Sequence, residues 1–327
     1  MIELLANVEG EYTIEKACTI VTNGKTITVK AGTDFNMASA DGKYTFTAKV
    51  YVAQVGTTKY ESFADAYAEA GSTTTIILLA DNINITAACR INENGKKNFT
   101  IPDGHAIGYN VDTFILPITG YSYLLPNADW KSESAKFTAW QWGGASDVMV
   151  EATDADNDGW YKVPILGNAT NMKFVRKNPA NTAKDLFEGK WNEGKEIKAS
   201  DKLYHWITGW DNSGSECVNP IFLIPNSNWK TDSARFAVYS YDSSSNEWDN
   251  MIKVNDDLYC VSVNDIKAKV GKNNLIFCRM NPANSTNNWD NKWNQAPGSG
   301  GYQIPTTGNN CFTISGWDSG SWNKLLD

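Results

Sequence analysis

One sequence unit occurs twice in this chain, with the second copy about a hundred residues after the first. The copies share an opening segment, a central segment that ends in Asn-Pro-Ala-Asn, and a closing Gly-Trp-Asp triplet. The matched segments are LLPNADWK at 124–131 and LIPNSNWK at 223–230, MKFVRKNPAN at 172–181 and LIFCRMNPAN at 275–284, and GWD at 209–211 and 316–318. A tandem repeat of this length is typical of two modules that fold alike.

Alternation of apolar and polar residues predicts a mainly β protein with tandem antiparallel β-sandwich modules. The runs KFTAWQW at 136–142 and RFAVYSY at 235–241 alternate strictly, as strands with one buried face do. Because Asn, Asp and Gly separate short runs of this kind, each copy is expected to be an all-β sandwich. The chain then divides into four regions. They are a small β-sheet module at 1–52, a helix plus β spacer at 53–118, and sandwich repeats at 119–215 and 216–327.

The region before the repeats alternates in short runs as well. Asn23-Gly24 and Asp41-Gly42 lie between these runs and accept the positive φ of tight hairpins, so we expect a small antiparallel sheet. Residues 62–70 have apolar residues at helical spacing, and Gly71 supplies a stop. The expected strands are at 12–14, 19–21, 26–29, 44–47, 75–79, 83–86 and 98–101.

Two further segments suggest how the first half of the chain is organised. The sequences VAQVG at 52–56, YESFADA at 60–66 and IILLAD at 76–81 resemble a segment of large secreted bacterial proteins, in which a short helix precedes right-handed β-coils or small spacer domains. That resemblance implies a spacer. LPITG at 116–120 spells the pattern that cell-wall sorting transpeptidases cleave, but neither an apolar anchor nor a basic tail follows closely. We therefore expect an interdomain linker at 116–120.

Charge and hydropathy exclude several classes of partner. The net charge is -8 and no basic run occurs, so neither nucleic acid nor an anionic membrane surface is an expected partner. No apolar stretch approaches the roughly 18 residues of a membrane span. The first residues lack the pattern of a secretory signal, which implies that a signal was removed or that the protein is exported by another route. A neutral partner fits this composition better.

Cysteine, histidine and aspartate patterns give no reason to expect a metal or another cofactor. The six cysteines form no C-x-x-C pair, and we favour buried free thiols over a bridge between Cys260 and Cys278. Zinc is not expected, because only two histidines occur and neither is near a cysteine pair. DADNDG at 154–159 matches the first half of a calcium loop but lacks the distal glutamate, so a plain hairpin turn is favoured.

The chain has no motif that indicates catalysis, but it has many aromatic residues that could bind a ligand with a flat surface. No G-x-S-x-G motif, phosphate loop or repeated carboxylate pair is present, so an enzyme is not expected. All thirteen tryptophans lie at or after Trp130, and many have polar neighbours, as in NNWDNKWNQ at 287–295. Aromatic rings beside amide groups suit a sugar, whose C–H face packs on the ring while its hydroxyls bond the amides.

The second copy resembles starch-binding carbohydrate-binding modules of family 26. The resemblance rests on Tyr239 and Tyr241 on an early strand, Trp248 shortly before Met251, LY at 258–259, IF at 276–277, and Gln295. It implies a sandwich in which Tyr239 and Trp248 cradle a curved α-glucan. It also implies that Tyr241 and Gln295 form hydrogen bonds with the sugar, and that Trp289 extends the surface.

The first copy departs from that pattern. Trp140 and Trp142 replace the two tyrosines, the loop at 143–147 is shorter, and no tryptophan occupies the position of Trp248. Glu193 stands where Gln295 does. Three interpretations stay open for this copy: weaker binding, binding of another glycan, or a role only as a spacer. The shared pair Trp191 and Trp293 is expected to be structural.

These patterns favour a non-catalytic, extracellular glycan-binding protein, with α-glucan as the expected ligand and two modules that raise avidity on a polymer. Two alternatives remain. The first is a structural or adhesive protein of a cell or virion surface, such as a filament subunit, a viral appendage or a capsid decoration, with self-assembly into a larger structure. The second is an accessory fragment of a larger amylase-like enzyme.

Overall fold

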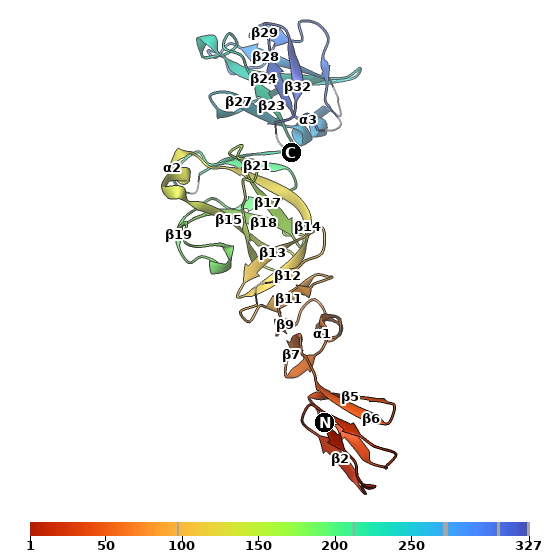
Figure 1. Cartoon of the computed structure of the whole chain (residues 1–327). Coiled ribbons are helices and arrows are strands. Elements are labelled where there is room, and N and C mark those ends of the chain that lie inside the picture. The colour runs from red at the N-terminus through yellow and green to blue at the C-terminus, as the bar shows by residue number, and fades with distance from the viewer. Residues whose placement is uncertain (97, 212, 271–273, 306–307, 326–327) are drawn as a thin grey trace. The chain divides into compact units, whose positions relative to one another are not determined.

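The computed structural model describes residues 1–96, 98–211, 213–270, 274–305 and 308–325, and it confirms a mainly β protein (Figure 1). Its residues form two compact units. The first consists of Met1–Asp103 and Asp112–Ile115, and the second of Gly104–Val111 and Leu116–Asp327. Among the described residues, no helix combines the length and the apolar character that crossing a membrane would require.

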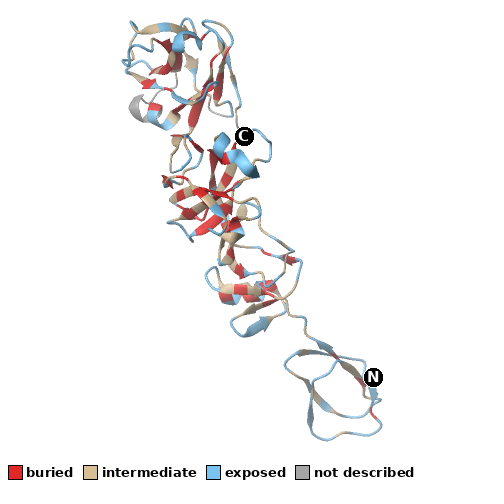
Figure 2. Cartoon of the chain, turned by 90° about the vertical axis from the view of Figure 1, so that its left-hand side faces the viewer, coloured by how far each residue is buried: buried red, intermediate tan, exposed pale blue. Residues whose placement is uncertain are grey.

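The N-terminal strands of the first unit form a sheet of order β1-β3-β6-β5 and a separate pair, β2 with β4. The bounds are β1 (Ile2–Glu3), β2 (Glu11–Ile14), β3 (Cys18–Val21), β4 (Thr28–Ala31), β5 (Phe35–Ala40) and β6 (Lys43–Ala48). Asp41-Gly42 forms the expected two-residue hairpin, with φ of 49° and 69°. The expected antiparallel sheet differs from the structure, because β1–β3 and β2–β4 are parallel pairs. In each pair, one other strand lies between the two partners in the sequence. Most residues here are exposed (Figure 2), around a core of Leu4, Ile20 and Phe46.

The expected helix of the first unit is α1 (Phe63–Ala70). It begins after Ser62, whose hydroxyl accepts a hydrogen bond from the Asp65 amide at 3.1 Å, and it ends at Gly71 with a φ of 62°. The short strands around it are β7 (Ala53–Val55), β8 (Thr58–Tyr60), β9 (Thr75–Leu78), β10 (Ile83–Asn84), β11 (Cys89–Asn92) and β12 (Phe99–Thr100).

The first repeat is built from two groups of strands, which belong to the second unit except for Asp112–Ile115 at the start of β14. One group runs in the order β19-β18-β15-β16-β13, and in the other β14 pairs with β17 and β21, while β21 also pairs with β22. The strands are β13 (His105–Asn110), β14 (Asp112–Leu125), β15 (Lys136–Trp142), β16 (Val148–Glu151), β17 (Tyr161–Leu166), β18 (Asn171–Lys177), β19 (Lys190–Glu193), β20 (Ile197–Lys198), β21 (Leu203–Trp206) and β22 (Ser215–Val218). The short helices are α2 (Ala128–Lys131), η1 (Ser132–Ser134) and η2 (Ala183–Asp185).

The segment 116–120, which was expected to be a linker, lies inside the long strand β14. Ile118 and Gly120 pair with Leu166 and Ile165 of β17, and the register shifts between them. The Pro117 carbonyl accepts a hydrogen bond from the Gly167 amide at 3.0 Å, although Pro117 has no N–H to donate. A bulge next to the proline thus lets the strand continue, so the segment is a β-strand, although the boundary between the two units does fall at its start, between Ile115 and Leu116.

The second repeat has the same two groups of strands, here as two separate sheets. Its sheets run β25-β24-β28-β29, with β30 beside β28, and β26-β27-β23-β31-β32. The bounds are β23 (Pro220–Ile224), η3 (Thr231–Ser233), β24 (Arg235–Tyr241), β25 (Asn246–Asn250), β26 (Ile252–Asn255), β27 (Leu258–Ser262), α3 (Val263–Val270), β28 (Asn274–Met280), β29 (Lys292–Ala296), β30 (Tyr302–Gln303), β31 (Cys311–Ile314) and β32 (Gly320–Asn323). The helix α3 departs from the all-β expectation for this copy. Each repeat also has one parallel pair among its antiparallel ones, β14 with β21 and β23 with β31.

Both repeats are held together by the same arrangement of tryptophan and arginine. In the first, the buried Trp130 indole donates to the Trp210 carbonyl at 2.7 Å. The buried Arg176 donates from Nε to the Trp130 carbonyl at 2.8 Å, and its guanidinium lies 4.6 Å from the Trp191 ring centroid. The second repeat reproduces these contacts with Trp229, Trp317, Arg279 and Trp293. Trp191 and Trp293 therefore each cover a buried cation, which is a structural role.

Five of the six cysteines are buried, Cys18 is partly exposed, and the structure has all six as free thiols. Cys260 and Cys278 lie in different sheets of the second repeat, so the alternative of a bridge between them is wrong. Cys260 instead contacts Cys217 of β22, and this hydrogen bond together with burial raises the pKa of the Cys260 thiol. Burial alone raises the pKa of Cys89 to about 12.

Candidate functional site

Four aromatic side chains of the second repeat contact one another on one face of the sheet β25-β24-β28-β29. Tyr239 of β24 lies opposite Trp248 of β25, with ring centroids 5.0 Å apart and planes at 53°. Trp289, from the loop between β28 and β29, lies 4.8 Å from Tyr239 and 5.0 Å from Trp248. Tyr241 stacks on Tyr239 at 5.7 Å. We call Tyr239, Tyr241, Trp248 and Trp289 the second platform.

Strand alternation explains why this platform faces outward. Phe236 and Val238 of β24 point into the core between the two sheets, so the residues that alternate with them point away from it. The platform rests on a small apolar strip of the same outer face, formed by Ala237, Ile276, Cys278 and Met280. Tyr239, Tyr241 and Trp248 are half-buried, and Trp289 is 45% exposed, so the rings remain accessible. Partial burial raises the pKa of Tyr239, with a smaller contribution from Tyr241.

Gln295 lies beside this surface, but its amide already has partners. It pairs with Cys278 across β28 and β29, and its Nε2 donates to the carbonyls of Pro297 at 2.9 Å and Gly298 at 3.3 Å. Its Oε1 accepts a hydrogen bond from the Lys292 ammonium, which lies 4.8 Å from the Trp289 ring centroid. The polar group at the edge of the rings is therefore Lys292, which the sequence analysis missed. The duplicated Lys-Trp-Asn-(Glu/Gln) segment at 190–193 and 292–295 was the signal for it.

The first repeat has a smaller aromatic surface at the equivalent place. Trp140 contacts Phe187, with ring centroids 5.2 Å apart and planes at 52°. Phe187 precedes Lys190 by three residues, as Trp289 precedes Lys292, so it is the counterpart of Trp289 that the sequence analysis did not single out. Trp142 is half-buried and lines the same hollow as Trp140. We call Trp140, Trp142 and Phe187 the first platform.

Strand pairing explains why the first platform lacks a counterpart of Trp248. Met149 of β16 lies opposite Trp140, as Trp248 lies opposite Tyr239. Met149 also pairs with Tyr109 of β13 and is fully buried. In the second repeat, β25 is instead the last strand of its sheet. An aromatic ring can thus be presented to solvent at the position of Trp248 and not at that of Met149.

The first platform has an ion pair beside it, whereas the second has neutral residues at the two corresponding positions. Beside it lies a shallow hollow of about 430 Å³ that is lined by Trp140, Trp142, Asp147, Lys173, Glu193, Gly194 and Glu196. Glu193 forms ion pairs with Lys173 at 3.0 Å and with Lys190 at 2.9 Å. Burial alone would raise the pKa of Glu193, but the hydrogen bonds from the two lysines outweigh it and hold that pKa below its usual value. The second repeat has Ile276 and Gln295 at the positions of Lys173 and Glu193.

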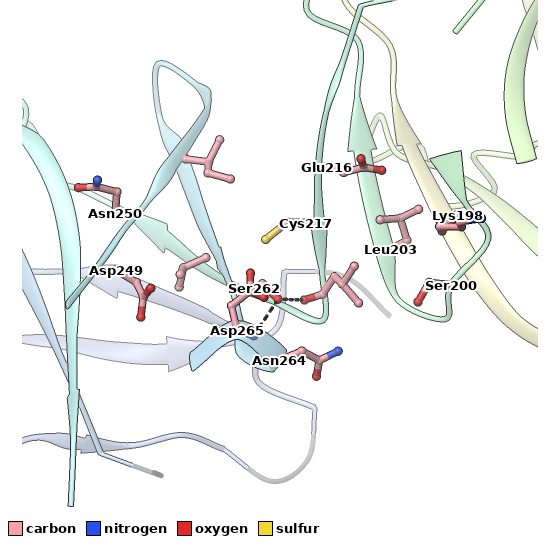
Figure 3. Close-up of a pocket in the computed structure, with 13 residues that line it drawn as sticks. Lys198, Ser200, Leu203, Glu216, Cys217, Asp249, Asn250, Ser262, Asn264 and Asp265 are labelled. Carbon is pink, nitrogen blue, oxygen red and sulfur yellow. Dashed lines mark hydrogen bonds between the residues drawn. The ribbon is translucent and has the colours of Figure 1, made fainter. Parts of the chain in front are cut away.

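Two other hollows lie in the second unit. Figure 3 shows one of about 530 Å³ between β21–β22 and the segment β25 to α3, where the Ser262 hydroxyl donates to the Val218 carbonyl at 2.8 Å. The residues that line it include no aromatic ring, so it offers no stacking surface for a sugar. The other, of about 290 Å³, lies beside Trp160 and the aspartates of the 154–159 turn.

The 154–159 segment forms a turn between β16 and β17. The carboxylates of Asp154, Asp156 and Asp158 lie within 4.8 Å of one another. Asp154 accepts a hydrogen bond from the Gly159 amide at 3.2 Å, and Asp158 accepts one from the Trp160 amide at 2.7 Å. Burial and the neighbouring aspartates raise the pKa of Asp158, against the effect of its bond to the Trp160 amide. Two of the carboxylates thus cap the turn itself.

No family model and no curated protein matches this sequence. Among solved structures, the chain is similar to family 41 carbohydrate-binding modules from streptococcal virulence factors, described as recognising α-glucan, with 12% identity over 60% of this chain and 93% of that one and a TM-score of 0.19. A family 26 module of Eubacterium rectale Amy13K in complex with maltoheptaose has 15% identity, coverage of 63% and 98%, and a TM-score of 0.18. The multi-modular glycogen-degrading pneumococcal virulence factor SpuA has 11% identity, coverage of 62% and 21%, and a TM-score of 0.20. At such TM-scores these likenesses carry no weight for what this chain binds.

Proposed function

We propose that this protein is a non-catalytic glycan-binding protein whose second repeat binds a neutral α-glucan on the second platform. The observation that carries the proposal is the meeting of four rings from two strands and one loop on an outward face. Their centroids lie within 5.7 Å of a neighbouring ring, and Trp289 remains 45% exposed. Exposed aromatic clusters of this kind mark binding surfaces.

The geometry suits a curved chain of pyranose rings. Tyr239 and Trp248 meet at 53°, and Trp248 and Trp289 meet at 68°, so successive sugars can pack on faces of different direction. The Lys292 ammonium has donors beyond the one it gives to Gln295, and these can reach sugar hydroxyls beside Trp289. The choice of α-glucan rests on the resemblance of Tyr239, Trp248 and Gln295 to the family 26 pattern.

The first platform supports a smaller contribution to this function. It has two contacting rings in place of a cluster of four, and an ion pair beside them in place of neutral side chains. Desolvating charged groups against sugar hydroxyls is unfavourable unless new hydrogen bonds replace the lost water. The first repeat should therefore bind neutral α-glucan more weakly than the second, and its contribution on a polymer would be avidity. Binding a polysaccharide or a cell-surface glycan fits a location outside the cell.

The test is calorimetric titration of the whole chain with maltoheptaose, together with affinity electrophoresis in gels that contain soluble starch. Trp248→Ala should weaken binding by about tenfold or more, because it removes a ring from the centre of the cluster. Trp317→Ala is the matched control, because Trp317 is 48% exposed in the same repeat and contacts none of the platform rings. Failure of the unmodified chain to bind either ligand would refute the proposal, as would equal losses in the two variants.

A further inference from the structure

Trp289 lies on an irregular loop, and the Arg235 guanidinium forms several hydrogen bonds with that loop. The loop runs from the end of β28 to the start of β29, and residues 282–286 are all exposed. Arg235 donates from Nε to the carbonyls of Asn281 at 3.2 Å and Asn284 at 2.8 Å, and from Nη2 to the Thr286 carbonyl at 3.0 Å. Three backbone carbonyls on the approach to Trp289 are thus fixed by one side chain.

The same guanidinium also ties the loop to the strand that carries Trp248. Arg235 Nη1 donates to the side-chain oxygens of Asn287, two residues before Trp289, and of Asn250, at 3.1 Å for the latter. The Asn287 amide also donates to Asn250 at 3.1 Å. Asn250 belongs to β25 and lies two residues after Trp248, on the same face of that strand. Arg235 itself lies four residues before Tyr239 on β24, so one cation connects all three segments of the second platform.

The first repeat pins its equivalent loop with different residues. At the position of Arg235 it has the exposed Lys136. The fully buried Lys177 of β18 instead donates to the carbonyls of Thr182 and, at 2.6 Å, of Leu186, just before Phe187. Glu151, which occupies the strand position of Asn250, accepts a hydrogen bond from the Ala183 amide at 2.7 Å. Two unrelated sets of residues thus fasten the ring-bearing loop to the corresponding strand of each repeat, β16 in the first and β25 in the second.

We propose that Arg235 is the positioning residue of the second platform: it holds Trp289 against Tyr239 and Trp248 before any ligand arrives. This inference rests on the proposed function. An unpinned loop would have to be ordered during binding, which lowers affinity. A lysine cannot replace Arg235, because the loop carbonyls and the Asn250 oxygen require the several fixed N–H donors of a guanidinium.

The test uses the full chain and a signal that requires no ligand. Trp248 and Trp289 are 5.0 Å apart at 68°, so their coupled transitions should give an exciton couplet in the far-ultraviolet circular dichroism spectrum. Trp289→Ala measures the size of that couplet. Arg235→Gln and Arg235→Lys should each lose it, whereas Arg235→Gln added to Trp289→Ala should change nothing further, as expected of coupled residues. Asn250→Ala, which removes the strand end of the connection, should weaken the couplet in the same direction.

Affinity completes the test. Arg235→Gln and Arg235→Lys should bind maltoheptaose about tenfold more weakly, while the matched control Lys136→Gln should leave both affinity and couplet unchanged. Retention of the couplet in Arg235→Gln, or of its affinity to within about twofold, would overturn the inference. If the unmodified chain binds no glucan but the couplet depends on Arg235, the proposed function fails while the assignment of Arg235 to the placing of Trp289 stands.

Discussion

Acid should destabilise the second unit through one histidine. His205 of β21 is 1% exposed, lies against the Phe174 ring at 5.7 Å, and has no hydrogen-bond partner on either ring nitrogen. A Cβ atom at Gly214 would lie only 2.5 Å from the imidazole, so the backbone packs closely against the ring at this point. Burial, with a smaller effect from Lys195, lowers the pKa of His205 from 6.5 to about 4.

The sign and size follow from the two pKa values. The unfolded chain binds a proton at His205 more readily than the folded chain does, so the stability present above pH 6.5 is lost as the pH falls toward 4. At about 1.4 kcal/mol for each unit of pKa difference, the full loss is about 3 kcal/mol, and about 2.5 kcal/mol of it should appear between pH 7.5 and pH 4.5.

Denaturant unfolding followed by tryptophan emission measures this loss in the second unit alone, since all thirteen tryptophans lie at or after Trp130. His205→Phe keeps a ring in the site and removes the titrating group, so its stability should fall by about 2.5 kcal/mol less over the same pH range. His105→Gln is the control and should keep the full pH dependence. An equal slope in His205→Phe and the unmodified protein would show that the buried imidazole is not the cause.

Three further outcomes are expected. In the folded protein, Cys18 should react with a thiol reagent first and Cys278, whose pKa burial raises to about 12, only after unfolding; rapid labelling of Cys278 in the native state would contradict this. Trp229→Ala should lower the free energy of unfolding by about 3–5 kcal/mol, because the fully buried indole leaves a cavity and an unpaired carbonyl, and a loss below about 1 kcal/mol would refute that role. The double variant Lys173→Ile with Glu193→Gln removes the ion pair and gives the first repeat the neutral residues of the second at these positions. Titration should then show tighter maltoheptaose binding than in the unmodified chain. No gain in affinity would mean that the ion pair does not limit binding.

The strands and the single N-terminal helix could be predicted because their signals are local. The alternating runs at 136–142 and 235–241 correspond to β15 and β24, and Ser62 with Gly71 marks the ends of α1. The segment 116–120 was misjudged because Pro and Gly usually interrupt a strand, whereas here a bulge opposite β17 accommodates them. Pairing partners far apart in the sequence decide such cases.

The candidate site was predictable in its residue types and less so in its partners. Repeat comparison and family resemblance pointed to Tyr239 and Trp248, which the structure brings into contact. The sequence could not show that the Gln295 amide donates to the carbonyls of Pro297 and Gly298, because only the folded turn brings these groups together. Phe187 was not identified because the segment between Asn-Pro-Ala-Asn and Lys-Trp-Asn is one residue longer in the first copy, so an alignment without a gap does not match Phe187 with Trp289.

In β15 and β24, alternate side chains face the core and the outside, so the residues required for folding differ from those available to a ligand. The inward Phe137 and Phe236, together with the tryptophan and arginine pairs, are the same in the two copies, whereas the outward rings are Trp140 and Trp142 in the first copy and Tyr239 and Tyr241 in the second. Exchanging Trp140 and Trp142 with Tyr239 and Tyr241 should therefore change the ligand preference of each copy with little effect on folding. The chain thus presents one scaffold twice, with a different pair of outward rings on each copy.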